Sequence, residues 1–309
     1  MPKAYGDWRA LIDDPAVDAV SIATPPSVQA QIAIHALELG KPVFAEKPMA
    51  STLEEARAML RTAERSNTPA MIDFSFHQIM TWQRAKTMID EGAIGALRHV
   101  VVNWHVETTA TRKRIRNWKT LNCDGGGVLG NFVSHCFHYL EWFCGPAAPL
   151  TARLSGPPGD NNLQTTAAIM LEFAGGQIAS LSVSCASYLG SGHRIEFYGE
   201  DGALVLHNPG SDYMRGFELF YAKRPMAAMD RTTIEDPLDT KYADGRIVPV
   251  LRLSSRFLHA IETEGPIYPG FAEGYRVQRL LDAAQRSHRD GSTIEIDLQG
   301  RPAAAVKPV

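Results

Sequence analysis

Cysteine is scarce in this sequence of 309 residues, and long apolar runs are absent. The four cysteines, Cys123, Cys136, Cys144 and Cys185, have neither a C-x-x-C spacing nor the density of a secreted disulfide scaffold. No apolar run reaches the roughly 20 residues that span a bilayer, and the polar start MPKAYGDWR cannot serve as the apolar region of a signal peptide. We therefore expect reduced thiols, no membrane partner and a cytoplasmic location.

The sequence also lacks a surplus of one charge. It has 31 basic and 34 acidic residues, a formal net charge of -3, and its one basic cluster, Arg112, Lys113, Arg114 and Arg116, is short. This balance gives no field that would gather a polyanion, so nucleic acid is not expected as a partner. Hydrophobic residues at 45% and charged residues at 21% are typical of a globular protein, and the length favours two domains.

Strands and helices alternate in the first part of the chain. The loop Thr24-Pro25-Pro26 separates a strand rich in β-branched residues from a helix, and Thr52 with Glu55 three residues later is typical of a capping box that starts a helix. This alternation predicts a parallel α/β sheet in a domain of residues 1–92. The expected strands cover residues 17–23, 42–45 and 71–76, and the expected helices cover residues 8–12, 26–40, 52–65 and 80–91.

The pattern changes after residue 92. Strands with GG, GE and DG turns between neighbours predict a large, mostly antiparallel sheet in an α+β domain of residues 93–309. Residues 212–247 have low periodicity and are interpreted as a long excursion. The expected strands cover residues 97–106, 165–173, 177–187, 193–199 and 203–207, and the expected helices cover residues 129–143, 250–262 and 273–288.

Three segments resemble one known family. Residues 17–48 end in Glu46-Lys47-Pro48, residues 125–145 read GGGVLGNFVSHCFHYLEWFCG, and residues 265–291 form a closing helix. Together they resemble the glucose-fructose oxidoreductase, inositol dehydrogenase and rhizopine-catabolism family of nicotinamide-dependent sugar and polyol dehydrogenases. The resemblance implies a Rossmann-type domain, NAD or NADP as cofactor, hydride exchange with a secondary alcohol of a small sugar or polyol, and a homo-oligomer, either a dimer or a tetramer.

The first segment carries the cofactor side of the implied site. In the family, the lysine that stands here as Lys47 reaches between the nicotinamide and the reacting carbinol and binds the substrate oxygen. The resemblance gives cofactor contacts to both loops of this segment, although Gln29 stands where the family usually has histidine. The expected cofactor-binding residues are Thr24, Pro25, Pro26, Gln29, Glu46, Lys47 and Pro48.

The second segment carries the substrate side. The family has an aspartate and, four residues later, a histidine; this chain has Asn131 and His135, a spacing that puts both side chains on one face of a helix. Asparagine has no titratable proton near neutral pH, so His135 is the expected base, Lys47 stabilises alkoxide charge, and Asn131 contributes hydrogen bonds. Trp118 and Lys119 precede the glycines where the family often presents such residues to the substrate. The catalytic set is therefore Lys47, Asn131 and His135, which also bind substrate with Trp118 and Lys119.

One family feature is missing. No strand, G-x-G-x-x-G turn and helix open the sequence, so the Rossmann-type sheet is expected to be incomplete and the choice between NAD and NADP stays open. A start codon placed too late is favoured over a genuine truncation as the explanation. The alternative functions are a non-catalytic sugar- or nucleotide-binding regulator and an inactive truncated family member.

Metal-dependent chemistry is a further alternative. Cys123, His135, His138 and Glu141 lie near one helix, but their spacings match no closed zinc pattern and they rotate progressively around the helix. We therefore expect no metal, and we interpret His138 as structural.

Overall fold

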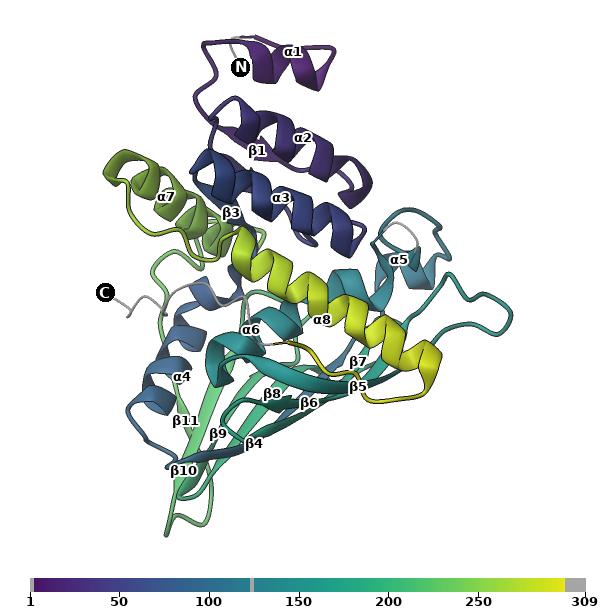
Figure 1. Cartoon of the computed structure of the whole chain (residues 1–309). Coiled ribbons are helices and arrows are strands. Elements are labelled where there is room, and N and C mark those ends of the chain that lie inside the picture. Colours follow the sequence, from purple (N-terminus) through teal and green to yellow (C-terminus); the bar gives the residue numbers. More distant parts are fainter. Residues whose placement is uncertain (1–2, 123–124, 298–309) are drawn as a thin grey trace.

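The computed structural model describes residues 3–122 and 125–297, which form two sheets (Figure 1). The first sheet is parallel, in the order β1-β2-β3, and each connection between its strands contains a helix. This arrangement confirms the predicted parallel α/β sheet. The elements of this part are α1 (Trp8–Asp13), β1 (Val20–Ile22), α2 (Pro26–Glu38), β2 (Val43–Ala45), α3 (Leu53–Ser66) and β3 (Ala70–Ile72).

Local sequence signals determine where the two connecting helices begin and end. Pro26 occupies the first turn of α2, where its missing N–H would have no partner inside the helix. At α3 the Thr52 hydroxyl accepts from the Glu55 amide at 3.2 Å and Glu55 Oε2 accepts from the Thr52 amide at 3.1 Å, as the capping box predicts. Asn67 ends α3 in the left-handed conformation, with φ of 49°.

The predicted third strand is wrong beyond Ile72. β3 ends at Ile72, and the chain then enters a short 3₁₀ turn, η1 (Ser75–Gln78), before α4 (Met80–Asp90). Phe74, Phe76 and His77 are all buried, so this segment has no solvent face with which a strand could alternate. Packing of these rings against the second sheet's core overrides the β propensity of the sequence.

The second sheet has eight strands in the order β11-β10-β9-β8-β4-β7-β6-β5. Only the β4–β7 pair is parallel, which confirms a mostly antiparallel sheet. The strands are β4 (Leu97–His105), β5 (Ala147–Ser155), β6 (Thr166–Phe173), β7 (Ile178–Ser184), β8 (Gly192–Gly199), β9 (Gly202–Asn208), β10 (Glu218–Lys223) and β11 (Asp230–Thr232).

Three of these strands escaped the sequence prediction. β5 contains Pro149 and its first residues lack clean alternation. β10 and β11 pair as a hairpin inside the stretch that was interpreted as an irregular excursion, so that interpretation is wrong for the residues of the hairpin. β11 consists of the polar residues Asp230, Arg231 and Thr232, which carry no apolar periodicity.

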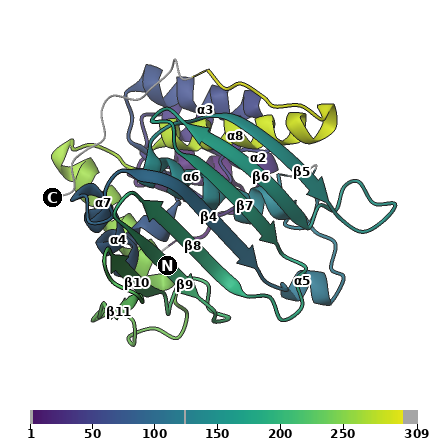
Figure 2. The same cartoon turned by 90° about the horizontal axis from the view of Figure 1, so that it is seen from below.

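Helices cover one face of the large sheet and leave the other bare (Figures 1 and 2). α6 (Ser134–Cys144) and α8 (Phe271–Asp290) lie over it, and α8 also packs against α3 and β3. α7 (Ile247–Thr263) places Leu253 and Phe257 against the parallel sheet, and α5 (Thr109–Arg112) is a single turn. Buried residues of both sheets and of α8 form one continuous apolar core. Among the described helices, none combines the length and apolar character that a membrane span requires.

Candidate active site

Chemically active side chains follow all three parallel strands at the point where each strand ends. The strands are in register, with Ile22 opposite Ala45 and Ala45 opposite Ile72. The register continues past the strands, because the Glu46 amide donates to the Ile22 carbonyl at 3.0 Å and the Asp73 amide donates to the Ala45 carbonyl at 2.8 Å. The carboxyl edge of a parallel sheet is the usual ligand-binding edge of such folds.

Lys47 connects this edge to the substrate half of the chain. Its Nζ donates to the main-chain carbonyl of Asn131 at 3.0 Å. Burial lowers the pKa of Lys47 to about 8; the charge of Lys119 acts in the same direction, and the carboxylates of Glu46 and Asp73 oppose it. A lysine in this state is able to exchange a proton near neutral pH.

Gln29 holds the loop that carries Lys47. Its side chain is 1% exposed, and Nε2 contacts the main-chain carbonyls of Glu46 at 2.6 Å, Met49 at 3.0 Å and Pro48 at 3.2 Å. An amide nitrogen has two N–H groups, so it shares these donors among three carbonyls. Gln29 is therefore placed to fix the backbone on either side of Lys47.

The first loop carries an unpaired polar atom. Thr24 Oγ1 is buried without a hydrogen-bond partner, one position before Pro25 and Pro26 open α2. Ser51 Oγ is buried and unpaired in the same way, and a Cβ added to Gly125 would lie 3.4 Å from both the Pro26 Cβ and the Ser51 Cα. The glycine loop therefore packs directly on the loops that carry Pro26 and Ser51.

His135 lies at the start of α6, directly after a π-helical segment, η3 (Leu129–Val133). Its ring is 6% exposed and meets the rings of Phe76 at 5.0 Å and Phe74 at 6.1 Å, both edge-on. Burial, with the charge of Lys47 as the next cause, holds the pKa of His135 well below its usual range. The ring is therefore neutral at pH 7, and its Nδ1 has no hydrogen-bond partner in the part of the chain that the structure describes.

Asn131 lies beside Lys47 through its backbone, and its side chain turns elsewhere. Nδ2 donates to the carbonyl of Gly127 at 3.1 Å and to that of Lys119. The amide thus anchors the loop that precedes the helix. The predicted meeting of Asn131 and His135 on one helix face assumed α-helical geometry, whereas Asn131 is in the wider π-helical turn.

Trp118 and Lys119 lie in the loop that Asn131 anchors. Lys119 is exposed, and its Nζ sits over the Trp118 ring at 5.3 Å from the ring centroid. The Lys119 carbonyl also accepts from the Gly127 amide at 3.0 Å. The chain thereby holds a half-buried aromatic side chain and a cation next to the glycines, at the entrance to the helix that carries His135.

The glycines of this loop have the literal spacing G-x-G-x-x-G, at Gly125, Gly127 and Gly130, but they are packed by protein. A Cβ on Gly126 would lie 2.0 Å from the Trp118 carbonyl oxygen, one on Gly127 2.1 Å from Asn122 Oδ1, and one on Gly130 1.7 Å from the Gly125 carbonyl oxygen. In the described residues, none of the turns that follow β1, β2 and β3 is glycine-rich. The spacing here serves close packing and does not form a phosphate cradle.

Two residues near the site, Asp73 and Tyr213, were not predicted from the sequence. Asp73 follows β3 and is 6% exposed; burial, and next the carboxylate of Glu46, raise its pKa to about 7. Tyr213 comes from the stretch after β9, and its ring lies 6.4 Å from those of Phe76 and Trp104. Asp73 could have been found from the rule that ligands bind where parallel strands end; Tyr213 depends on a long-range connection.

His138 packs among aromatic rings. Its ring stacks on Phe74 at 4.5 Å and lies 5.6 Å from His77 and 6.0 Å from Tyr268. Glu141 points to Arg276 instead, with its Oε1 2.8 Å from Arg276 Nε. No group of three metal-ligating side chains occurs in the part of the chain that the structure describes, and Cys123 lies outside it.

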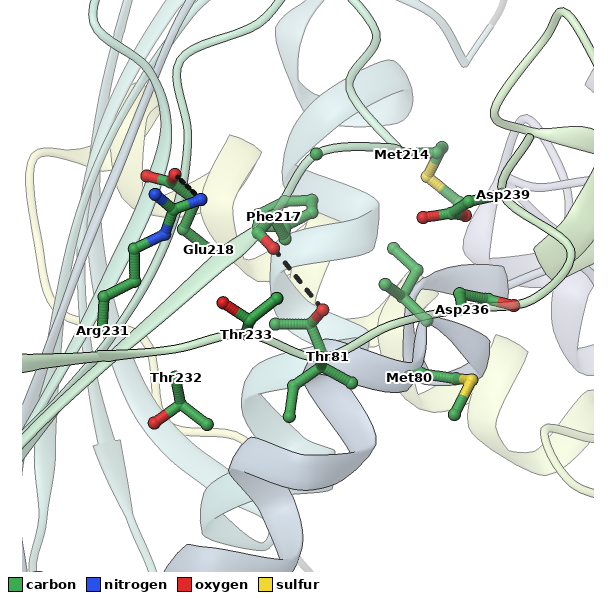
Figure 3. A pocket seen from close by; sticks show the side chains of 13 residues that line it. Met80, Thr81, Met214, Phe217, Glu218, Arg231, Thr232, Thr233, Asp236 and Asp239 are labelled. Atoms are coloured by element: carbon green, nitrogen blue, oxygen red, sulfur yellow. Dashed lines mark hydrogen bonds and ion pairs between the residues drawn. The ribbon is translucent and has the colours of Figure 1, made fainter.

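A hollow of about 270 Å³ lies apart from these residues (Figure 3). The start of α4, the β10–β11 hairpin and the chain after β11 line it. Its wall is tied together by the Arg231–Glu218 ion pair at 2.8 Å and by a long contact of 3.5 Å from the Thr81 hydroxyl to the Phe217 carbonyl. None of the predicted site residues lines this hollow.

Comparison with known proteins identifies the family. Residues 2–74 match the oxidoreductase family with an NAD-binding Rossmann fold, and residues 82–205 match the GFO/IDH/MocA C-terminal domain. An uncharacterized oxidoreductase of Synechocystis sp. is 33% identical over 306 residues, covering 94% of this chain and 82% of that protein. The chain belongs to the GFO/IDH/MocA oxidoreductase family. Its N-terminal part is accordingly of the NAD-binding Rossmann type.

This chain is similar to levoglucosan dehydrogenase in both sequence and structure. The enzyme from Pseudarthrobacter phenanthrenivorans is 26% identical over 330 residues, covering 95% of this chain and 84% of that protein. A structure of levoglucosan dehydrogenase in complex with NADH and levoglucosan matches with a TM-score of 0.84, covering 94% of this chain and 84% of that chain. The match extends over both sheets, which supports the two-sheet architecture as a family property.

Proposed function

We propose that the protein transfers a hydride between a nicotinamide cofactor and a secondary alcohol of a sugar, polyol or related small molecule. The observation that carries this proposal is the contact of Lys47 with Asn131, which brings a lysine of low pKa from the carboxyl edge of the parallel sheet to the helix that bears His135. The family membership supplies the reaction class, and levoglucosan dehydrogenase supports the substrate class.

The residues present fit the nicotinamide end of a dinucleotide. Thr24 offers a buried hydroxyl without a partner, and Pro25, Pro26, Glu46 and Pro48 form the loops around it. These residues, with Gln29 behind them and Lys47 at the inner end, would hold the cofactor at the strand ends. When bound, the nicotinamide would supply the hydride acceptor or donor. NAD and NADP both remain candidates.

Lys47 and His135 would take different roles in the reaction. Oxidation of an alcohol releases a hydroxyl proton, and a neutral Lys47 is the stronger proton acceptor because its pKa is about 8, whereas that of His135 is far lower. His135 keeps Nδ1 free to hydrogen-bond the substrate hydroxyl and orient it. This reverses the roles that the sequence suggested, in which His135 was the base and Lys47 the electrostatic partner.

The loop before the glycines is proposed as the outer wall of the substrate site. Trp118 and Lys119 are held next to the η3 segment by Asn131, and an aromatic ring with an adjacent cation suits a polyhydroxylated ligand. Tyr213 would form the opposite wall, since its hydroxyl lies within the electrostatic influence of Glu46 and is hydrogen-bonded with Arg246.

The domain division, the assembly and the location belong to the same proposal. We divide the chain into a dinucleotide-binding part of residues 1–92 and a substrate-binding and oligomerisation part of residues 93–309. Figure 2 shows the face of the large sheet that no described helix covers. On the strands of this sheet exposed side chains alternate with buried ones, and the exposed positions include Met170 at 57% and Ile178 at 46% exposure. A second copy of this chain is the partner we propose for this face. The buried free thiols Cys136 and Cys185 support a cytoplasmic location.

The experiment is titration of the 309-residue chain with NADH and NADPH, followed by a turnover screen. Inositols, hexoses and anhydrosugars are supplied with the oxidised cofactor, and formation of reduced nicotinamide is measured by absorbance. Lys47→Ala is the test variant and Lys241→Ala, an exposed lysine, is the matched control. Turnover lost only in Lys47→Ala supports the proposal; saturable binding without turnover by any substrate supports the regulator instead.

A further inference from the structure

Asp73 has a carboxyl oxygen that finds no hydrogen-bond partner among the described residues. Its carboxyl is 6% exposed, and Oδ1 is buried without a hydrogen bond, while Ser75 serves the group as a hydrogen-bond donor. A buried polar atom left unpaired destabilises the folded state, because it gives up its hydrogen bonds to water and gains none in return. The group therefore calls for a functional explanation.

The position of Asp73 supplies that explanation. Its amide donates to the Ala45 carbonyl, so Asp73 sits beside the Glu46-Lys47 turn on the neighbouring strand. Lys47 lies in that turn with its Nζ at the Asn131 carbonyl, and the charges of Lys47 and the Asp73 carboxyl act on each other. The side chain of Asn131 cannot titrate, and its N–H groups are engaged by the Gly127 and Lys119 carbonyls.

We propose that Asp73 is a positioning residue that sets the protonation of Lys47 during alcohol oxidation. The charged groups around Lys47 are Glu46 and Asp73 from the strand ends, Lys119 from the outer loop and, when protonated, His135 from α6. Of these, Asp73 is the buried carboxyl, and it has a free oxygen. This inference rests on the proposed function, because it describes the proton acceptor of that reaction.

The proton path balances with this assignment. The substrate O–H bond breaks and an N–H bond forms on neutral Lys47, while the carbon-bound hydrogen leaves with its electron pair for the nicotinamide. Lys47 becomes an ammonium beside an ionised Asp73, so the new charge is created next to an opposite one. The pair titrates as a unit, since each group favours the charged form of the other.

The experiment is a measurement of the Lys47 pKa by NMR of isotope-labelled lysine side chains, with the resonance assigned by its loss in Lys47→Arg. Asp73→Asn keeps the shape and removes the charge, and Asp18→Asn is the control at an exposed position in the same part of the chain. We expect the Lys47 pKa to fall by on the order of one unit in Asp73→Asn and to stay unchanged in Asp18→Asn. The acid limb of the oxidation pH profile should move to lower pH by the same amount.

A folded Asp73→Asn protein with an unchanged Lys47 pKa would overturn the inference. Should Asp73→Asn not fold, Asp73→Ser provides the same test with a smaller polar side chain. The NMR titration needs no turnover, so it tests Asp73 even if every substrate fails. Conversely, normal turnover with an unshifted Lys47 pKa would leave the proposed function intact and remove Asp73 from it.

Discussion

The ammonium group of Lys47 donates to the main-chain carbonyl of Asn131, 84 residues later in the chain, at 3.0 Å. This single bond joins the loop after β2 to the turn that leads into α6. Because the acceptor is a main-chain atom, its position depends on the π-helical turn and not on the identity of the side chain at 131. The relationship explains how the contact can persist with asparagine where the family has aspartate.

Turnover should require a side chain at position 47 that can take up and release a proton. Lys47→Ala is expected to lower kcat by about 10²- to 10⁴-fold, and Lys47→Arg should fall in the same range because arginine keeps the charge but does not give up its proton. Cofactor affinity should change little in Lys47→Arg. Steady-state kinetics and cofactor titration check both, and full activity of Lys47→Arg would exclude proton transfer by this residue.

Asn131→Asp, which restores the family residue, should not improve this enzyme. A carboxylate would face the Gly127 and Lys119 carbonyls that the amide now binds, so two hydrogen bonds become repulsive contacts. We expect a loss of about 1–3 kcal/mol in the free energy of unfolding and no gain in turnover. Denaturant unfolding and kinetics measure these effects, with the exposed Asn161→Asp as the control; a gain in kcat would show that the side chain at 131 reaches the substrate.

Gln29 should affect turnover through the Lys47 loop. Gln29→Ala removes the donor that three carbonyls share, so we expect a lower kcat together with a destabilisation of about 1–3 kcal/mol. Gln29→His, which introduces the residue usual in the family, should recover part of the activity through a ring N–H. If Gln29→Ala loses stability while kcat stays unchanged, the residue has only a structural role.

Four buried histidines predict a loss of stability in acid. Burial lowers the pKa of His77 and His193 to about 3 and holds those of His135 and His138 well below the usual range. The unfolded chain, with histidine pKa values of about 6.5, then binds more protons than the folded one, so the free energy of unfolding falls as pH drops below about 6.5.

Each such histidine contributes a slope of up to about 1.4 kcal/mol per pH unit in that window. Carboxyl groups whose pKa values burial raises act oppositely; they are Asp73, with a pKa of about 7, Glu141, Asp239 and Glu273. His138→Phe should lower the slope of the free energy of unfolding against pH by the contribution of about one proton. His259→Asn, at an exposed position, should leave that slope unchanged. Denaturant unfolding at a series of pH values measures both slopes, and equal slopes for His138→Phe and the parent chain would contradict the assignment.

The glycine loop should not tolerate a methyl group. Gly130→Ala would place a Cβ 1.7 Å from the Gly125 carbonyl oxygen, so we expect destabilisation by about 3 kcal/mol or more. Gly6→Ala is the matched control, because nothing lies within 4 Å of the added atom. Thermal unfolding distinguishes the two, and a stable, active Gly130→Ala protein would mean that the loop can move away from the helix start.

Local patterns predicted much of the fold. Thr52 and Glu55 form their capping box because its hydrogen bonds lie within four residues, and the strand of Val100, Val102 and Trp104 alternates because one face is buried. Residues 73–76 failed because both of their faces are buried, and β11 failed because only pairing with β10 makes it a strand. Where burial does not alternate along a segment, the apolar periodicity of the sequence cannot identify its secondary structure.

The candidate site, like the fold, could be predicted only in part from local sequence. Lys47 and His135 could be proposed from the sequence because whole segments around them resemble a family. The direction of the Asn131 side chain was missed because a π-helical turn has no sequence signature that we could use. Asp73 was missed because its importance arises from register with β2, and Tyr213 because it arrives from a distant stretch of chain.

The return of the chain to the parallel sheet determines which parts can be exchanged between relatives. Gly270 pairs with Met71, the Ile72 amide donates to the Pro269 carbonyl, and α8 then packs on both α3 and β5. A chimera that swaps substrate halves by cutting once, near residue 92, would therefore pair α3 with a foreign α8. A second junction before α8 would restore the contact with α3 but place α8 on a foreign β5, so α8 has to be matched to both halves.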